Sequence, residues 1–106
     1  MAKTTKKKKL MVSIPMRGFS DEEIKSQLDL VKATLEPQGY EIIDSFLEQD
    51  AGNDIVNPPV YYLARSLQVM SKCDAVYFCH GWNQARGCVI EYNVALQYGV
   101  EIIKES

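Results

Sequence analysis

The chain has 106 residues, of which 46% are hydrophobic and 25% charged, and its net charge is −2 at pH 7. This length suits one domain and leaves no room for a second hydrophobic core. The slight negative charge argues against binding to nucleic-acid polymers, which depends on a basic surface. The sequence also has no apolar run of about 18 residues, so we expect no membrane span.

The three cysteines are Cys73, Cys79 and Cys88. Their odd number and unpaired spacing are typical neither of a disulfide framework nor of a zinc site, so we expect no bound metal. No signal-peptide core follows the basic N-terminus. These features together predict a reducing, cytoplasmic environment.

Lysines crowd the first nine residues of the chain. We interpret residues 1–9 as a flexible basic tail and residues 10–106 as the folded domain. An alternative is that the lysines form a patch for phosphate or for a membrane surface.

The first half of the domain alternates strand and helix. The apolar run Leu10–Ile14 predicts a strand, and residues 40–43 predict a second one. Between them, Ser20 followed by Glu23 is a capping box, which marks the start of a helix. Gly39 ends that helix, whose apolar residues recur at helical spacing: Ile24, Leu28, Val31 and Leu35.

A long polar loop over residues 44–57 comes next, and it is acidic. Loops of this length in small domains are often lids over a site. Pro58 and Pro59 suit the start of a second helix. Residues 75–79 then form a short, apolar run that is typical of a central parallel strand.

The last elements are a helix from about Gly87 to Tyr98, closed by Gly99, and a strand over residues 100–103. Strands that alternate with helices predict a mostly parallel, four-stranded sheet with helices on both faces. The economical strand order is 2-1-3-4. In this order, the loops after strands one and three lie side by side, where such sheets bind ligands.

The loop after the first strand contains Pro15, Met16, Arg17 and Gly18. Gly18 lets a ligand approach the backbone, and the Arg17 guanidinium suits a phosphate or carboxylate. The helix that begins near Ser20 would add free N–H groups and a positive dipole end. The alternative is a tight turn with a solvated Arg17.

Arg86 and Gly87 repeat this pattern at the start of the last helix, where Arg86 could instead pair with the acidic loop. One turn further, Glu91 shares an otherwise apolar helical face with Ala95. Carboxylates are rarely buried without a partner or a purpose. An ionised, partly desolvated glutamate suits nucleophilic attack on a sugar anomeric carbon. The alternative is a structural salt bridge with Arg86.

His80 and Trp82 lie in the loop after the third strand. Trp82 could stack on a nucleobase and His80 could donate a hydrogen bond to a base or sugar, although either could equally serve loop packing. The sequence lacks G-x-G-x-x-G and the Walker phosphate loop, which argues against a dinucleotide dehydrogenase or a P-loop NTPase. We therefore expect no cofactor.

Two stretches resemble nucleoside 2-deoxyribosyltransferase-like proteins, a group that includes 2′-deoxynucleoside 5′-phosphate N-hydrolases. The first is Ile14-Pro15-Met16-Arg17-Gly18, and the second runs from Cys73 to Ala95 with the spacing Gly87, Glu91, Ala95. The resemblance implies a small flavodoxin-like three-layer sandwich and a homo-oligomer, a dimer or larger. It also implies that Glu91 is the nucleophile and that Arg17 and Gly18 hold a 5′-phosphate.

The chain departs from the transferases at one position. They carry an aspartate six residues before the nucleophile, where it handles the leaving base, and this chain has Ala85 there. Loss of a general acid lowers the rate of such a reaction by roughly 10²–10⁴-fold. The leading hypothesis is an N-glycosidic hydrolase or transferase that acts on a nucleoside or deoxynucleoside 5′-phosphate. The alternative is a non-catalytic module that senses or sequesters a nucleotide-derived ligand.

Overall fold

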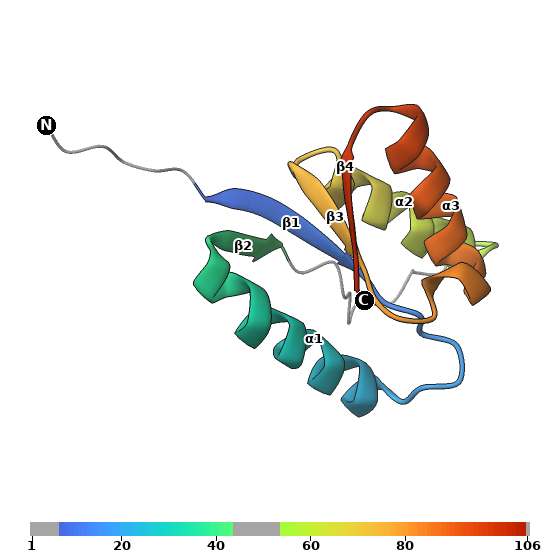
Figure 1. The fold of residues 1–106 in the computed structure, drawn as a ribbon. Helices are drawn as coiled ribbons and strands as arrows, with labels where there is room; N and C mark the ends of the chain where they lie inside the picture. Colours follow the sequence, from blue (N-terminus) through green and yellow to red (C-terminus); the bar gives the residue numbers. More distant parts are fainter. Residues whose placement is uncertain (1–6, 44–53, 106) are drawn as a thin grey trace, which may run out of the picture.

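A single parallel sheet forms the centre of the protein. The structure, a computed structural model, describes residues 7–43 and 54–105. Four strands pair in the order β2-β1-β3-β4, and every pairing is parallel (Figure 1). Their bounds are β1 Lys8–Ser13, β2 Tyr40–Ile43, β3 Ala75–Phe78 and β4 Glu101–Lys104. The predicted strand order is confirmed.

Three helices cover the two faces of the sheet. Helix α1 (Asp21–Leu35) lies on one face, and α2 (Pro58–Met70) and α3 (Arg86–Gln97) lie on the other (Figure 1). Two short 3₁₀ segments, η1 (Glu36–Gln38) and η2 (Trp82–Gln84), complete the elements. This is the predicted flavodoxin-like three-layer sandwich. None of the described helices is long and apolar enough to cross a membrane.

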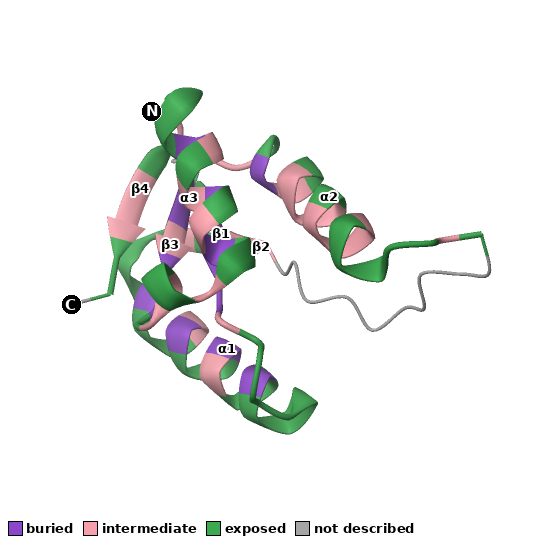
Figure 2. Cartoon of the chain, turned by 90° about the vertical axis from the view of Figure 1, so that its right-hand side faces the viewer, coloured by how far each residue is buried: buried purple, intermediate pink, exposed green. Residues whose placement is uncertain are grey.

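Alternating side chains of β1 divide the core in two. Leu10 and Val12 pack with the apolar stripe of α1, whereas Met11 packs with Met70 of α2 and Ala95 of α3. This follows from the strand geometry, because successive side chains point to opposite faces. Figure 2 shows α1 with several buried positions, whereas α2 is mainly half-buried or exposed. Helix α2 is therefore the least buried of the three helices that flank the sheet.

Helix α1 begins as the capping box predicts. The Ser20 hydroxyl accepts from the Glu23 backbone N–H at 3.1 Å, and the Glu23 carboxylate accepts from the Ser20 N–H at 2.8 Å. Gly39 ends the following 3₁₀ turn with a φ of +99°, a conformation that favours glycine. In α2, Asn57 is the N-cap and accepts from the Val60 N–H at 3.2 Å. Residues 44–53 of the expected lid lie outside the described residues.

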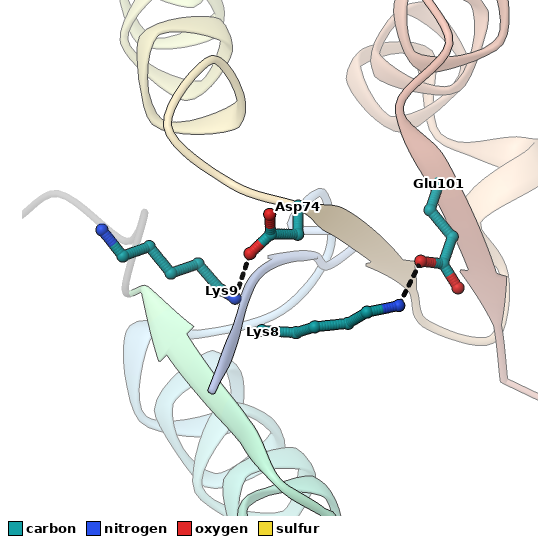
Figure 3. A network of polar contacts seen from close by, with 4 residues as sticks. All are labelled: Lys8, Lys9, Asp74 and Glu101. Atoms are coloured by element: carbon teal, nitrogen blue, oxygen red, sulfur yellow. Dashed lines mark hydrogen bonds and ion pairs between the residues drawn. The ribbon is translucent and has the colours of Figure 1, made fainter. Parts of the chain in front are cut away.

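Strand β1 begins at Lys8 rather than Leu10, so Lys8 and Lys9 belong to the sheet and not to the tail. Lys8 and Lys9 pair with Tyr40 and Glu41 of β2. Figure 3 shows two further contacts at this end: Lys8 forms an ion pair with Glu101 at 2.9 Å, and the Lys9 backbone N–H donates to Asp74 at 2.8 Å. These contacts extend the strand beyond its apolar run. Residues 1–6 of the expected tail lie outside the described residues. Other boundaries differ by about one residue, as is usual at element ends.

Candidate functional site

The loops that follow β1 and β3 meet at one edge of the sheet. The Cys79 backbone N–H donates to the Ser13 carbonyl at 3.0 Å, which aligns the two strand ends. Beyond them, a Cβ placed on Gly81 would lie 3.8 Å from Cγ of Pro15. Gly18 has a φ of +89°, so its turn requires glycine. The predicted convergence of these two loops is confirmed.

Glu91 extends from α3 into the interior beneath this edge. Its side chain is only 8% exposed, and its Oε1 accepts a hydrogen bond of 2.6 Å from the hydroxyl of Ser13, the last residue of β1. Burial raises the pKa of the Glu91 carboxyl, while hydrogen bonds with Ser13 and Ser66 act in the opposite direction. Burial has the larger effect because it penalises the charged form.

A salt bridge between Glu91 and Arg86 does not form. Within the described ranges, the one ion pair joins Lys8 and Glu101 at the opposite edge of the sheet. Glu91 is therefore a buried carboxyl held by neutral hydroxyls. Such a group keeps more of its negative charge available to a reaction partner than a carboxylate paired with a cation.

Two buried thiols flank the site. Burial raises the pKa of Cys88 to about 11 and that of Cys79 to about 12, so both are protonated at neutral pH. Nucleophilic cysteines need the thiolate, so these thiols are poorly suited to attack. The nearby Ser13 hydroxyl lowers the pKa of Cys88, although less than burial raises it, and the same hydroxyl donates to Glu91.

The start of α3 is open to an anion. Its N-cap residue, Ala85, provides no side-chain hydrogen bond, and no acidic residue lies in the first turn. The N–H groups of that turn and the positive end of the helix dipole therefore face outward without a partner from the cap. A Cβ on Gly87 would meet nothing within 4 Å, so packing does not require glycine there.

The start of α1 is less favourable to an anion by the same criteria. The capping box uses the N–H groups of Ser20 and Glu23, and Asp21, Glu22 and Glu23 place negative charge in the first turn. The helix near Ser20 therefore has fewer free N–H groups for a ligand than expected, and its acidic side chains oppose an anion. An anion at this edge would bind at α3 instead, together with arginine side chains from the two loops.

The remaining predicted binding residues surround this edge to different degrees. Pro15 is half-buried, whereas the others are exposed: Met16, Arg17, Gly18, His80, Arg86 and Gly87. Within the described ranges, neither Arg17 nor Arg86 has a hydrogen bond or an ion pair, so both guanidinium groups are available to a ligand. The backbone N–H of His80 donates to Glu105 at 2.9 Å, which anchors the loop without using the imidazole.

Trp82 packs against the protein itself. Its ring stacks on Tyr92 with centroids 4.3 Å apart, and Phe78 lies 5.5 Å away. The Lys104 ammonium group lies 5.8 Å from the Trp82 ring centroid. With one ring face taken by Tyr92, this placement favours the packing role for Trp82 over stacking on a base.

Sequence reasoning did not single out the two hydroxyls that hold Glu91. Ser13 ends β1 directly after the buried apolar run 10–12 and is 2% exposed, and Ser66 is half-buried on α2. A lone hydroxyl inside the apolar run before Pro15 is the signal that could have identified Ser13. Nothing in the spacing of α2 distinguishes Ser66 from a surface serine.

The opposite edge of the sheet carries an open hollow of about 460 Å³, lined by Lys7, Lys8, Lys9, Glu41, Lys72 and Asp74. Its charges are mixed, and Lys8 and Asp74 already have partners. Helix C-termini point to this edge, where cations are favoured, which accounts for the lysines without a ligand. No three metal-ligating side chains cluster anywhere in residues 7–43 and 54–105.

Comparison with known proteins identifies the fold and the family. The structure is similar to a 2-deoxyribosyltransferase from Bacillus psychrosaccharolyticus, with a TM-score of 0.65, 13% sequence identity, and coverage of 91% of this chain and 70% of that one. The chain therefore has the fold of a nucleoside 2-deoxyribosyltransferase-like protein. No curated protein sequence matches it. A family model described as a domain of unknown function, DUF4406, matches residues 8–104, and the chain belongs to this family.

Proposed function

We propose that this protein cleaves the N-glycosidic bond of a nucleoside or deoxynucleoside 5′-phosphate, with Glu91 as the nucleophile. The observation that carries the proposal is the buried Glu91 carboxyl, hydrogen-bonded by Ser13, where the two loops meet. The similar solved structure is a 2-deoxyribosyltransferase, whose name indicates glycosyl transfer from a nucleoside. Its fold supports the same class of chemistry here.

In this reaction, a Glu91 carboxylate oxygen attacks the anomeric carbon of the sugar. The bond from that carbon to the base nitrogen breaks, and the base leaves with the electron pair and takes up a proton. Water then hydrolyses the glycosyl ester, or a second base displaces the carboxylate. Burial raises the pKa of Glu91, so the reaction requires a pH at which the carboxyl has ionised.

A phosphorylated substrate is supported by the open start of α3. The uncapped N–H groups there suit a phosphate, as helix N-termini do in many proteins. Arg86 and Gly87 belong to this turn, and Arg17 and Gly18 lie on the adjoining loop. Arginine binds phosphate through a planar set of donors. His80, exposed on the same loop system, is the candidate to protonate the leaving base.

Hydrolysis is favoured over transfer because Ala85 cannot bind or protonate an incoming base. The same residue supports the second candidate function, a non-catalytic module that binds a nucleotide. That module predicts tight binding without turnover.

We further propose a cytoplasmic homo-oligomer. The three cysteines are free, as a reducing compartment favours. Several large apolar side chains are exposed on the loops and helices, and they are the candidates for a contact between subunits: Met16 46%, Phe19 50%, Val56 98% and Val60 59%.

The decisive experiment incubates the protein with ribo- and deoxyribonucleoside 5′-monophosphates and measures free base by chromatography. Glu91→Gln is the matched control, because the amide keeps the size of the side chain but is a far weaker nucleophile. We expect base release that falls by at least roughly 10⁴-fold in the variant. Release that persists in Glu91→Gln would overturn the proposed nucleophile. Nucleotide-dependent thermal stabilisation without release would support the binding module instead.

A further inference from the structure

The Ser13 hydroxyl lies close to two side chains of α3. It donates to Oε1 of Glu91 at 2.6 Å in a buried contact, and its proximity also lowers the pKa of the Cys88 thiol, against the larger effect of burial. Ser13 and Cys88 are 2% and 4% exposed, so water has little access to compete for the hydrogen bond to Glu91. The end of β1 is thereby linked directly to the first two turns of α3.

The direction of this bond follows from the donors available. A serine hydroxyl has one proton to donate and two lone pairs to accept. Burial keeps the Cys88 thiol protonated at neutral pH, and a neutral thiol is a weak acceptor that competes poorly with the Glu91 carboxylate. The single Ser13 proton is then directed to Glu91, which as a carboxylate only accepts.

We propose that Ser13 is a positioning residue that holds Oε1 of Glu91 at the end of β1. Its catalytic consequence depends on the proposed function of Glu91 as nucleophile. With Oε1 held in this way, the orientation of the carboxyl group is set by β1, a central strand of the sheet, rather than by α3 alone. A hydrogen bond to a charged acceptor is stronger than one between neutral groups, so Ser13 favours the ionised carboxylate.

The groups that surround Glu91 are mostly neutral, so the effect of the Ser13 hydroxyl on the pKa of Glu91 can be measured. Ser13 approaches from β1, Ser66 from α2 and Cys88 from its own helix. Of the charged side chains on α2 and α3, Arg65 contacts the Tyr61 hydroxyl at 3.2 Å and Arg86 is exposed. Among the described residues, no charged side chain contributes to the pKa shift of Glu91, so removal of one hydroxyl should change that pKa measurably.

The test is a direct titration of Glu91 by carbon-13 NMR of the side-chain carboxyl, assigned with Glu91→Gln. In Ser13→Ala, we expect the apparent pKa of Glu91 to rise by about one to two pH units, because one hydrogen bond to the charged form is lost. Ser13→Thr, which keeps the hydroxyl, should restore most of the difference. Ser71→Ala, which removes an exposed hydroxyl bonded to the Gln68 carbonyl, is the control and should change nothing.

A second variant tests whether the effect belongs to the hydroxyl. Cys88→Val has a similar volume and leaves the Ser13 hydroxyl in place, so the pKa of Glu91 should change far less than in Ser13→Ala. An unchanged titration in Ser13→Ala, or an equal rise in Cys88→Val, overturns the proposal. If Ser13→Ala fails to fold, Ser13→Cys, which keeps the volume but donates far more weakly, should show the rise, and its absence overturns the proposal.

The titration does not depend on turnover, so it separates this inference from the proposed function. If nucleotides release base, the acid limb of the kcat/KM profile should move upward with the NMR value in Ser13→Ala. A shifted titration in a protein that releases no base supports the positioning role and overturns the catalytic function. Base release by a protein whose Glu91 titration is unshifted in Ser13→Ala supports the catalytic function and overturns the positioning role of Ser13.

Discussion

The Ser13 hydroxyl and the Glu91 carboxylate lie 2.6 Å apart, although 78 residues separate them in the chain. Ser13 ends β1, and Glu91 lies in the second turn of α3, which follows β3 after a short 3₁₀ turn. Because β1 and β3 pair in parallel, the end of one strand meets the helix that follows the other. The candidate nucleophile is thus positioned by the sheet topology.

Glu91→Gln should stabilise the protein at neutral pH. Burial raises the pKa of the folded-state carboxyl above its ordinary value of 4.5. The folded state then holds a proton that the unfolded state has already lost, so stability falls as the pH rises through this window. The loss of stability caused by the ionised Glu91 is absent below the pKa of the unfolded state and complete above the pKa of the folded state. Glutamine avoids it and still accepts from Ser13.

Urea unfolding at a series of pH values measures this difference. We expect the variant to exceed the wild type in free energy of unfolding at pH 7 and the gap to narrow towards pH 4. Glu22→Gln, an exposed carboxylate in the first turn of α1, controls for net charge. A gap that widens on acidification would contradict the sign of the shift.

Gly87→Ala should separate stability from binding. Packing leaves space for a methyl group at this helical position, so alanine should stabilise the fold by about 0.4–1 kcal/mol through reduced entropy of the unfolded chain. The same methyl would stand between a phosphate and the α3 backbone and should weaken nucleotide binding by roughly tenfold, or about 1.4 kcal/mol. Calorimetric titration and denaturant unfolding measure the two effects.

The control for Gly87→Ala is Asn93→Ala, an exposed position further along α3. It should also stabilise the helix, because alanine has the higher helix propensity, but it should leave binding unchanged. Unaltered nucleotide affinity in Gly87→Ala would argue against a phosphate at this turn.

Ala85→Asp should supply the missing N-cap. The Ala85 backbone is extended, with φ −109° and ψ 121°, so an aspartate there can accept from N–H groups of the first turn. We expect a gain of about 0.5–2 kcal/mol in stability and weaker binding of nucleoside monophosphates, because the carboxylate occupies the anion site and repels phosphate. Ala85→Asn, a neutral cap, should stabilise similarly and reduce affinity less. If Ala85→Asp and Ala85→Asn bind the nucleotide equally well, charge repulsion is not the cause of the weaker binding.

The Trp82–Tyr92 stack should couple the η2 turn to α3. The ring centroids lie 4.3 Å apart with an interplanar angle of 21°, and such pairs contribute about 0.5–1.5 kcal/mol beyond burial. A double-mutant cycle with Trp82→Leu and Tyr92→Leu, measured by chemical denaturation, should recover a coupling in this range. Additive losses combined with weaker nucleotide binding in Trp82→Leu would instead favour a ligand role for the indole.

Local sequence patterns predicted most of the elements because their causes are local. The capping box of Ser20 and Glu23 gave the start of α1 correctly, and Gly39 marked the end of the following turn. The start of β1 was not predictable in this way. Lys8 and Lys9 join the strand by pairing with β2, and they also contact Glu101 and Asp74; all these partners are distant in sequence.

In the candidate site too, residues marked by a local pattern were predictable, and residues whose role depends on distant contacts were not. Glu91 stood out as a carboxylate on an apolar helical face, a pattern visible within a few residues, and its burial agrees with that interpretation. Ser13 did not stand out, because a serine has no distinctive spacing and its role depends on what lies opposite. Likewise, Trp82 could be assigned to a loop but not to its partner, Tyr92.

The sequence by itself determined the order of strands and helices, the capping of α1 and the identity of Glu91 as the unusual carboxylate, since each depends on periodicity or on neighbouring residues. Only the tertiary structure decided which groups hold that carboxylate and which helix start is open to an anion. Parallel pairing of β1 and β3 brings Ser13 to Glu91, and no pattern within either segment records a contact made across the sheet.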